Sequence, residues 1–239
     1  MLDDLRTQWT ATWPQALAAW GRFVRLRPPM LHGRGEAPPG IGSFAWYSSG
    51  DVEVGIDLAQ VQKLGLSEHA VAVLAHEVGH HVLSPGDLFT RARLVQRVRM
   101  GLVDRDADAA LIANLWSDML INDRLQRRAG VRMDLLWRAI GPPTDPLFRM
   151  VMRADELLWQ LSPGTLTGAP ATGTAESDAQ LCPAGARVRR RSGGRGWWVR
   201  RAVPAAAARS GQRPRTPIDH AGVRAAPAGG HSASPWPDQ

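Results

Sequence analysis

The sequence is poor in cysteine, tyrosine and lysine. Its 239 residues include one Cys, one Tyr and a single Lys beside 28 Arg. The only cysteine, Cys182, cannot form a disulfide within the chain, and a metal site built from several thiolates is excluded. Any metal ion would therefore have to be held by histidine and carboxylate side chains.

The sequence also lacks a long apolar segment. No uninterrupted apolar run approaches the roughly 18–20 residues that a membrane-spanning helix needs. The first residues, Met1-Leu2-Asp3-Asp4, are acidic where a secretory signal would be basic, and no apolar stretch follows them. We therefore expect a cytoplasmic protein that has no membrane partner.

Acidic residues are scarce in the C-terminal third, which supplies the whole net charge of +7. Residues 1–161 contain 18 Lys and Arg and 18 Asp and Glu, whereas residues 162–239 contain 11 Arg and four acidic residues. Nucleic-acid binding would depend on that segment alone, through Arg189-Arg190-Arg191 and Trp197-Trp198. Because the rest of the chain is neutral, we expect no nucleic-acid partner.

Residues 162–239 lack any apolar periodicity. Ala, Gly, Pro and Arg make up about three-fifths of this segment, and Phe, Met, Tyr and Lys are absent. Such a composition buries too little apolar surface to offset the entropy of ordering, so we predict a disordered tail. The abrupt change is also typical of a frameshift in a GC-rich gene. A frameshift product and a native basic tail both remain open interpretations.

Apolar periodicity indicates one mainly helical domain over residues 1–161. Residues 43–58 alternate around a turn cluster and predict a β-hairpin, while residues 30–42, rich in Gly and Pro, predict a loop. Spacings of three and four predict helices over 2–26, 67–83, 88–101, 107–129, 133–140 and 147–161. The predicted fold class is therefore α+β, with a small hairpin-containing sheet and several helices.

An H-E-x-x-H motif, His76-Glu77-Val78-Gly79-His80, lies on the predicted helix 67–83. The two histidines are one turn apart, so both imidazoles can reach one Zn²⁺. Glu77 lies about 100° around the helix from His76, where it can act as general base on a zinc-activated water without binding the metal. The alternative is a helix that carries two surface histidines beside a glutamate.

A third metal ligand is expected from a carboxylate farther along the chain. On the predicted helix 107–129, Asp118 lies in the middle of a stripe of Leu and Asn residues. A carboxylate in an apolar interface needs a metal ion or a hydrogen-bonding partner, so Asp118 is the preferred ligand. The alternative is a buried aspartate bonded to a neighbouring amide. Asp123, which points toward Arg127, and Glu156 are the rival ligands.

These features together resemble a known family. A hairpin, then A-H-E-V-G-H-H over residues 75–81, then N-x-x-x-D-x-x-I-N over residues 114–122 resembles zincin-like metallopeptidase domains of bacteria, in particular those found with von Willebrand factor A-type (VWA) proteins and AAA-type ATPases. The resemblance covers about residues 40–161. It implies His76, His80 and Asp118 as zinc ligands and Glu77 as base. It also implies that a strand of the hairpin pairs with an extended peptide substrate.

The sequence therefore predicts a zinc-dependent metallopeptidase that acts on a peptide or protein. The alternative is a non-catalytic zincin scaffold that binds a VWA-type or ATPase partner, with zinc in a structural role. Well-studied peptidases also use a His or Tyr to stabilise the oxyanion. Tyr47, His69 and His81 are the candidates here, and spacing places none of them at the site. The intact Glu77 favours the enzyme, and the unplaced oxyanion group favours the scaffold.

Overall fold

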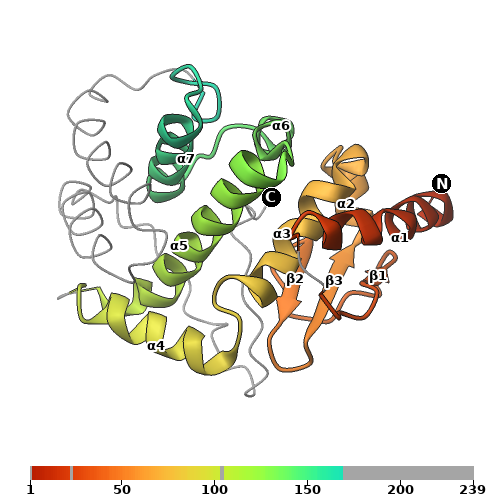
Figure 1. Ribbon diagram of the computed structural model, residues 1–239, viewed down its shortest axis with the longest axis horizontal. Coiled ribbons are helices and arrows are strands. Elements are labelled where there is room, and N and C mark those ends of the chain that lie inside the picture. Colours follow the sequence, from red (N-terminus) through yellow and green to blue (C-terminus); the bar gives the residue numbers. More distant parts are fainter. Residues whose placement is uncertain (1, 22–23, 103–104, 169–239) are drawn as a thin grey trace.

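The computed structural model describes residues 2–21, 24–102 and 105–168 (Figure 1). These residues form a mainly helical structure with one three-stranded sheet, which confirms the predicted mainly helical α+β class. None of the described helices is long and apolar enough to cross a membrane. The predicted tail from residue 169 onward, including Cys182, lies outside the described residues.

The first helix, α1 (Leu2–Ala18), supplies indole rings to the core. Trp9 is fully buried, and Trp20, just beyond the helix, donates from Nε1 to the carbonyl oxygen of Ala75 at 2.9 Å. The helix ends well before the predicted boundary near residue 26, because the chain turns at Gly21, whose φ is +59°. The Trp20 bond fixes this turn against the helix that carries the H-E-x-x-H motif.

The sheet contains the predicted hairpin and one unpredicted strand. Strands β2 (Ala45–Ser48) and β3 (Glu53–Asp57) pair antiparallel, as the sequence predicts. Strand β1 (Met30–His32) lies in the segment predicted as loop and pairs parallel with β3, so the strand order is β1-β3-β2. A strand of three residues is too short to show an alternating pattern, and its pairing relies on the backbone.

A short helix and a 3₁₀ turn connect the sheet to the central helix. Helix α2 (Leu58–Lys63) begins at Asp57, whose side chain accepts hydrogen bonds from the N–H groups of Ala59 and Gln60. A short 3₁₀ turn, η1 (Ser67–His69), then leads into α3 (Ala70–Val82). Helix α3 contacts α1 on one side and strand β2 on another, which places it at the centre of the fold.

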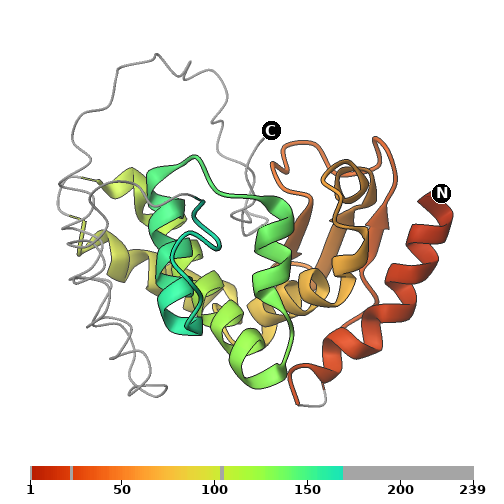
Figure 2. The same cartoon turned by 90° about the horizontal axis from the view of Figure 1, so that it is seen from above.

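The remaining helices lie on the other side of α3 (Figure 2). Helix α5 packs against α3, and it also contacts α4 and α7. A π-helical turn, η3, extends α5 and ends at Gly130, whose φ of +70° is typical of a glycine C-cap. The bounds of these elements are α4 (Leu88–Arg99), η2 (Asp106–Asp108), α5 (Ala109–Arg124), η3 (Leu125–Ala129), α6 (Met133–Ile140) and α7 (Pro146–Trp159).

Gly79 lets α3 approach α5 closely. A Cβ atom at this position would lie 2.5 Å from Cγ2 of Ile121 and 2.7 Å from the ring of Trp20. Both distances are shorter than atomic contact allows, so only glycine fits here. The glycine of the H-E-x-x-H motif therefore sets the spacing between the two helices that carry the predicted metal ligands.

Residues 162–168 pack against α7. Leu166 is 3% exposed, and the carboxylate of Glu156 accepts hydrogen bonds from the backbone N–H groups of Leu166 at 2.7 Å and Thr167 at 3.0 Å. The packed part of the chain thus runs to residue 168, beyond the predicted end of the domain at residue 161.

Candidate metal centre

The helix that carries the motif is buried on all sides. The sequence predicts an apolar face and a separate metal-binding face, but every residue from 72 to 80 on α3 is buried. Helix α1, the sheet and α5 each contact α3, so no face of this stretch reaches solvent. Amphipathic analysis fails here because a central helix has neighbours on all sides.

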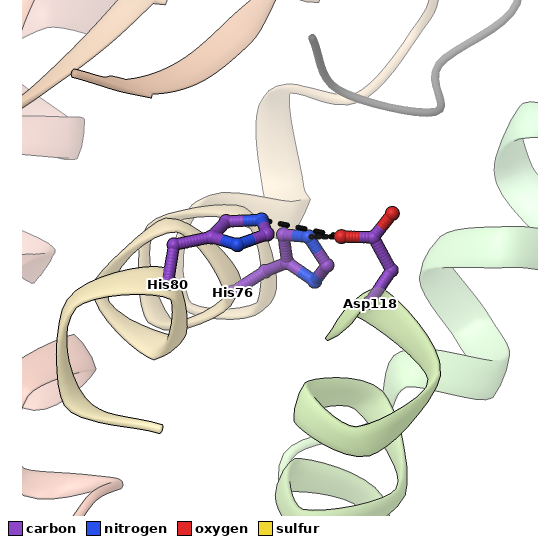
Figure 3. A group of neighbouring side chains, drawn as sticks. All are labelled: His76, His80 and Asp118. Atoms are coloured by element: carbon purple, nitrogen blue, oxygen red, sulfur yellow. Dashed lines mark ion pairs between the residues drawn. The ribbon is translucent and has the colours of Figure 1, made fainter. Parts of the chain in front are cut away.

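His76, His80 and Asp118 form one compact group (Figure 3). The Nε2 atom of His76 lies 3.4 Å from Oδ1 of Asp118, and the Nε2 atom of His80 lies 3.2 Å from the same oxygen. The side chains are 0%, 1% and 3% exposed, respectively. One ligand atom from each residue lies within 4.8 Å of the others, so the group could hold a metal ion.

The second nitrogen of each imidazole is fixed by an oxygen acceptor. Nδ1 of His76 donates to Oδ1 of Asn122 at 2.7 Å, and Nδ1 of His80 donates to the carbonyl oxygen of Ser84 at 3.1 Å. A proton held at Nδ1 leaves the lone pair at Nε2 for a metal ion, and such outer bonds also fix the ring orientation. The imidazoles are therefore preset for coordination through Nε2.

Sequence reasoning placed Asn122 on the same helix face as Asp118 and considered it a partner of that carboxylate, not of His76, and it gave Ser84 no role in the site. The position of Asn122 four residues after Asp118 is a signal that could have identified it as a partner of His76. Ser84 acts on His80 through its backbone carbonyl, for which side-chain patterns carry no signal. Its hydroxyl also lies 3.0 Å from the hydroxyl of Ser117 on α5, which ties the loop after α3 to that helix.

The two oxygens of Asp118 have different partners. Nδ2 of Asn114 donates to Oδ2 at 2.9 Å, whereas Oδ1 faces the two imidazoles. The alternative prediction, an aspartate bonded to a neighbouring amide, therefore describes one oxygen only. The other oxygen remains oriented toward the two Nε2 atoms, as a metal ligand would be.

Burial and ion pairing act in opposite directions on these groups. Burial lowers the pKa of His76, but its hydrogen bond with Asp118 and the charges of Glu77 and Asp118 outweigh burial and raise it. Burial raises the pKa of Asp118, but its hydrogen bonds with His76 and His80 outweigh burial and lower it. The carboxylate of Asp118 thus stays ionised and needs a cation, which a protonated imidazole or a metal ion can provide.

Glu77 is a buried acid beside this group. Its side chain is 1% exposed, and neither carboxylate oxygen has a hydrogen-bond partner among the described residues. Burial raises the pKa of Glu77, and the charges of His76 and His80 oppose the rise. A buried carboxyl group without a partner is costly, so Glu77 destabilises the fold unless a nearby cation or a proton compensates it.

The rival ligands lie elsewhere. Asp123 accepts a hydrogen bond from Nη2 of Arg127 at 2.7 Å, which confirms the predicted ion pair. Glu156 is bonded to Arg153 and to the backbone after α7, and neither acid belongs to the metal-binding group. Both Glu156 and Asp155 are fully buried on α7, although charged side chains normally lie at the surface.

Asp155 is a second buried acid that is influenced by the charge of Asp118. Neither of its oxygens has a hydrogen-bond partner within the described part of the chain. Burial raises its pKa well above the ordinary value, and the charges of Asp123 and Asp118 add to the rise. Its protonated, neutral form is therefore favoured relative to that of an exposed aspartate.

Two of the three candidate oxyanion residues pair with each other. The hydroxyl of Tyr47 on β2 lies 3.0 Å from Nδ1 of His81, and Tyr47 is 1% exposed. Burial raises the pKa of Tyr47 and lowers that of His81, so both groups are neutral near pH 7. The third candidate, His69, lies in η1 before α3 begins. The Tyr47–His81 pair joins the edge strand β2 to α3, the helix that carries His76 and His80.

Known proteins give no independent indication of the family. No family model matches the chain. Neither the curated proteins nor the solved structures include one that is significantly similar to it. A function must therefore be inferred from the buried metal-binding group and its surroundings.

Proposed function

We propose that this chain is a zinc-dependent metallopeptidase with a zincin-like domain. One observation carries the proposal: the Nε2 atoms of His76 and His80 converge on Oδ1 of Asp118, beside the carboxylate of Glu77, which has no hydrogen-bond partner among the described residues. Two imidazoles and one carboxylate are typical donors for a catalytic zinc ion. Three protein ligands leave a coordination position open, whereas structural zinc sites are closed by four.

The remaining groups support a hydrolytic mechanism. When bound, zinc supplies Lewis acidity and lowers the pKa of water to near neutral. Glu77 accepts a proton from the attacking water and donates it to the leaving amine. Burial raises the pKa of Glu77, which brings its proton affinity closer to that required near neutral pH. Asn122 and Ser84 hold the imidazoles in place through Nδ1.

The sheet edge supports a peptide substrate. Strand β2 lies at the edge of the sheet and contacts α3, as required of a strand that pairs with an extended peptide beside the site. The carbonyl of Phe44 accepts a hydrogen bond from the N–H of Asp57 on β3, so the polar groups of Ala45 point away from β3, toward the side of β2 where no other described strand pairs. The hydroxyl of Ser43 bonds to both of them, and a bound peptide would replace these two bonds.

Burial of the site favours the alternative, a non-catalytic scaffold for a VWA-type or ATPase partner. His76, Glu77, His80 and Asp118 are all almost completely buried, so a peptide reaches them only after a local opening. A purely structural site, however, gains nothing from Glu77, whose carboxyl group is buried and has no hydrogen-bond partner in the described part of the chain. The unfavourable burial of this side chain therefore supports the enzyme.

Glu77→Gln separates these two functions. In the full-length protein, we expect about one zinc per chain by elemental analysis and cleavage of casein or a peptide library. Glu77→Gln should keep zinc and the fold but lower the cleavage rate at least about a hundredfold, because the amide cannot accept the proton.

A ligand variant is the control for this test. His76→Ala should remove both zinc and cleavage, since it deletes a ligand. Zinc without cleavage in the unchanged protein would support the scaffold, and a protein purified without chelators that contains no metal would contradict both functions.

A further inference from the structure

The outer face of α4 is basic. The helix contains four arginines and no acidic residue. Arg93 and Arg97 are exposed and one helical turn apart, so their guanidinium groups lie on the same face. None of the ion pairs within the described part of the chain involves either residue. This face therefore presents two adjacent positive charges to the surroundings.

Two large apolar side chains flank these arginines. Phe89 is 70% exposed and Met100 is 63% exposed, more than any other large apolar residue in the described part of the chain. Phe89 lies one turn before Arg93, and the guanidinium of Arg93 is 5.4 Å from the centre of the Phe89 ring. Met100 lies three residues after Arg97. These four residues, the α4 stripe, share one face. Phe, Met and Arg are the residue types enriched at protein–protein interfaces.

The opposite face of α4 holds the helix in place. Val98 is buried with Ala109, Ile112 and Ala113 of α5, and Leu94 packs against the same cluster. Figure 1 shows α4 at the periphery, beside α5 and far from the sheet. The stripe is thus displayed on a helix that the core already fixes, so binding a partner would require little ordering.

The charge pattern favours a protein over a polyanion. Residues 1–161 contain 18 basic and 18 acidic residues, so this part of the chain has no net charge to attract nucleic acid or an anionic membrane from a distance. The stripe spans about 11 residues, or roughly 16 Å of helix, which matches a single short helix on a partner. Because the stripe has apolar ends and a basic centre, a complementary helix would carry two acidic residues between two apolar residues.

A second copy of the described domain does not offer this pattern. No described helix of the chain exposes two acidic side chains one turn apart: Asp3 and Asp4 on α1 are adjacent, and Asp155 and Glu156 on α7 are buried. The described helices of this chain therefore supply no complementary segment.

We propose that the α4 stripe is a docking surface for an acidic amphipathic helix of a partner protein. Carboxylates of that helix pair with Arg93 and Arg97, and its apolar side chains cover Phe89 and Met100. The surface is separate from the metal-binding group, and the proposal does not depend on peptidase activity.

The probe for this surface is a labelled synthetic helix with two Glu residues four positions apart between terminal leucines. We expect the full-length protein to bind it in a fluorescence anisotropy titration, with affinity that falls as salt rises. Arg93→Glu with Arg97→Glu should weaken binding at least about tenfold. Phe89→Ala should weaken it about threefold or more without changing the charge.

The matched control reverses two arginines elsewhere. Arg128→Glu with Arg138→Glu changes the charge equally at exposed positions on η3 and α6, and should alter binding less than about twofold. The same peptide with Gln in place of Glu should bind weakly to every variant. Circular dichroism should show the same helix content in all of them.

Several outcomes would overturn the proposal. One is an equal loss of peptide binding in both double variants. That result would show that the peptide is attracted to positive charge anywhere on the chain, including the C-terminal arginines. Failure of the unchanged protein to bind the peptide would also overturn it. A third contrary outcome is that the peptide does not bind, whereas phosphatidylserine vesicles or a 20-base-pair duplex do. If Arg93→Glu with Arg97→Glu abolished that binding, the surface would be assigned to a membrane or to nucleic acid instead.

Discussion

At the scale of single residues, Asp118 and Asp123 show how position decides chemistry. Both are aspartates on α5, five residues apart. The side chain of Asp118 is 3% exposed and faces two imidazoles, whereas that of Asp123 is 14% exposed and pairs with Arg127. Five residues correspond to about 140° around a helix, so the two side chains face different surroundings. The prediction that Asp118, and not Asp123, is the metal ligand rested on this difference in direction.

Removal of Asp118 should weaken zinc binding far more than removal of Asp123. We expect Asp118→Ala to raise the zinc dissociation constant at least about a hundredfold, because it deletes a direct ligand, and Asn122→Ala to raise it about 10–100-fold, because it frees the His76 ring. Asp123→Ala should leave it nearly unchanged. Competition with a zinc-binding dye measures all three constants.

Equal losses for Asp118→Ala and Asp123→Ala would contradict the assignment. If only Glu156→Ala weakened zinc binding, Glu156 would be the third ligand, although the structure places it outside the metal-binding group. Because Glu156 holds the turn after α7, its variant should change stability rather than zinc affinity.

At the scale of elements, the sequence predicts those that have a clear period or spacing. Helix α3, helix α5 and the hairpin β2–β3 follow from apolar spacing, and the one-turn separation of His76 and His80 follows from the motif. Strand β1 was missed because three residues carry no period. The inward orientation of Asp155 on α7 was missed because a charged residue is normally predicted at the surface.

The contacts around the site are harder to predict. The carbonyl of Ser84 bonds to His80 only because of the path that the backbone takes after α3. Tyr47 and His81 are 34 residues apart and meet because β2 packs against α3. Such contacts depend on tertiary structure, which local patterns in one sequence do not encode.

The close approach of α3 to α5 makes a second prediction at this scale. Gly79→Ala should lower the free energy of unfolding by about 1–3 kcal/mol, because its Cβ would overlap Ile121 and Trp20. It should also weaken zinc binding, since the displacement of α5 moves Asp118 away from the imidazoles. Chemical denaturation and the dye competition measure the two effects.

Gly50→Ala is the matched control for this prediction. Gly50 lies in the turn between β2 and β3, and a Cβ atom there would meet nothing within 4 Å. We expect it to change neither stability nor zinc affinity appreciably. If Gly79→Ala behaved like Gly50→Ala, the two helices could separate without disturbing the site, and Gly79 would not set their spacing.

At the scale of the whole molecule, the metal-binding group joins two parts of the fold. Figure 2 shows α1 and the sheet on one side of α3, and α5 and α7 on the other. The histidines belong to α3 and Asp118 belongs to α5, so a bound ion would link the two parts. Metal binding should therefore stabilise the fold as a whole, because an ion that binds only the folded state shifts the unfolding equilibrium.

The extent of the folded domain gives the last prediction. A chain that ends at residue 168 should be as stable as the full-length protein, whereas one that ends at residue 161 should lose about 2–4 kcal/mol. The shorter chain lacks the buried Leu166 and leaves the carboxylate of Glu156 without the N–H donors of Leu166 and Thr167. For a domain of this size, the loss corresponds to a Tm lower by about 5–15 °C.

Zinc content separates this effect from damage to the site. Both truncated chains should bind zinc equally at low temperature, because Glu156 anchors the turn and does not belong to the metal-binding group. Equal Tm values would mean that residues 162–168 add no stability and that the predicted boundary at residue 161 is adequate. A folded 1–161 chain that cannot bind zinc would show instead that α7 supports α5 at Asp118, and that the turn after α7 is part of the scaffold of the metal centre.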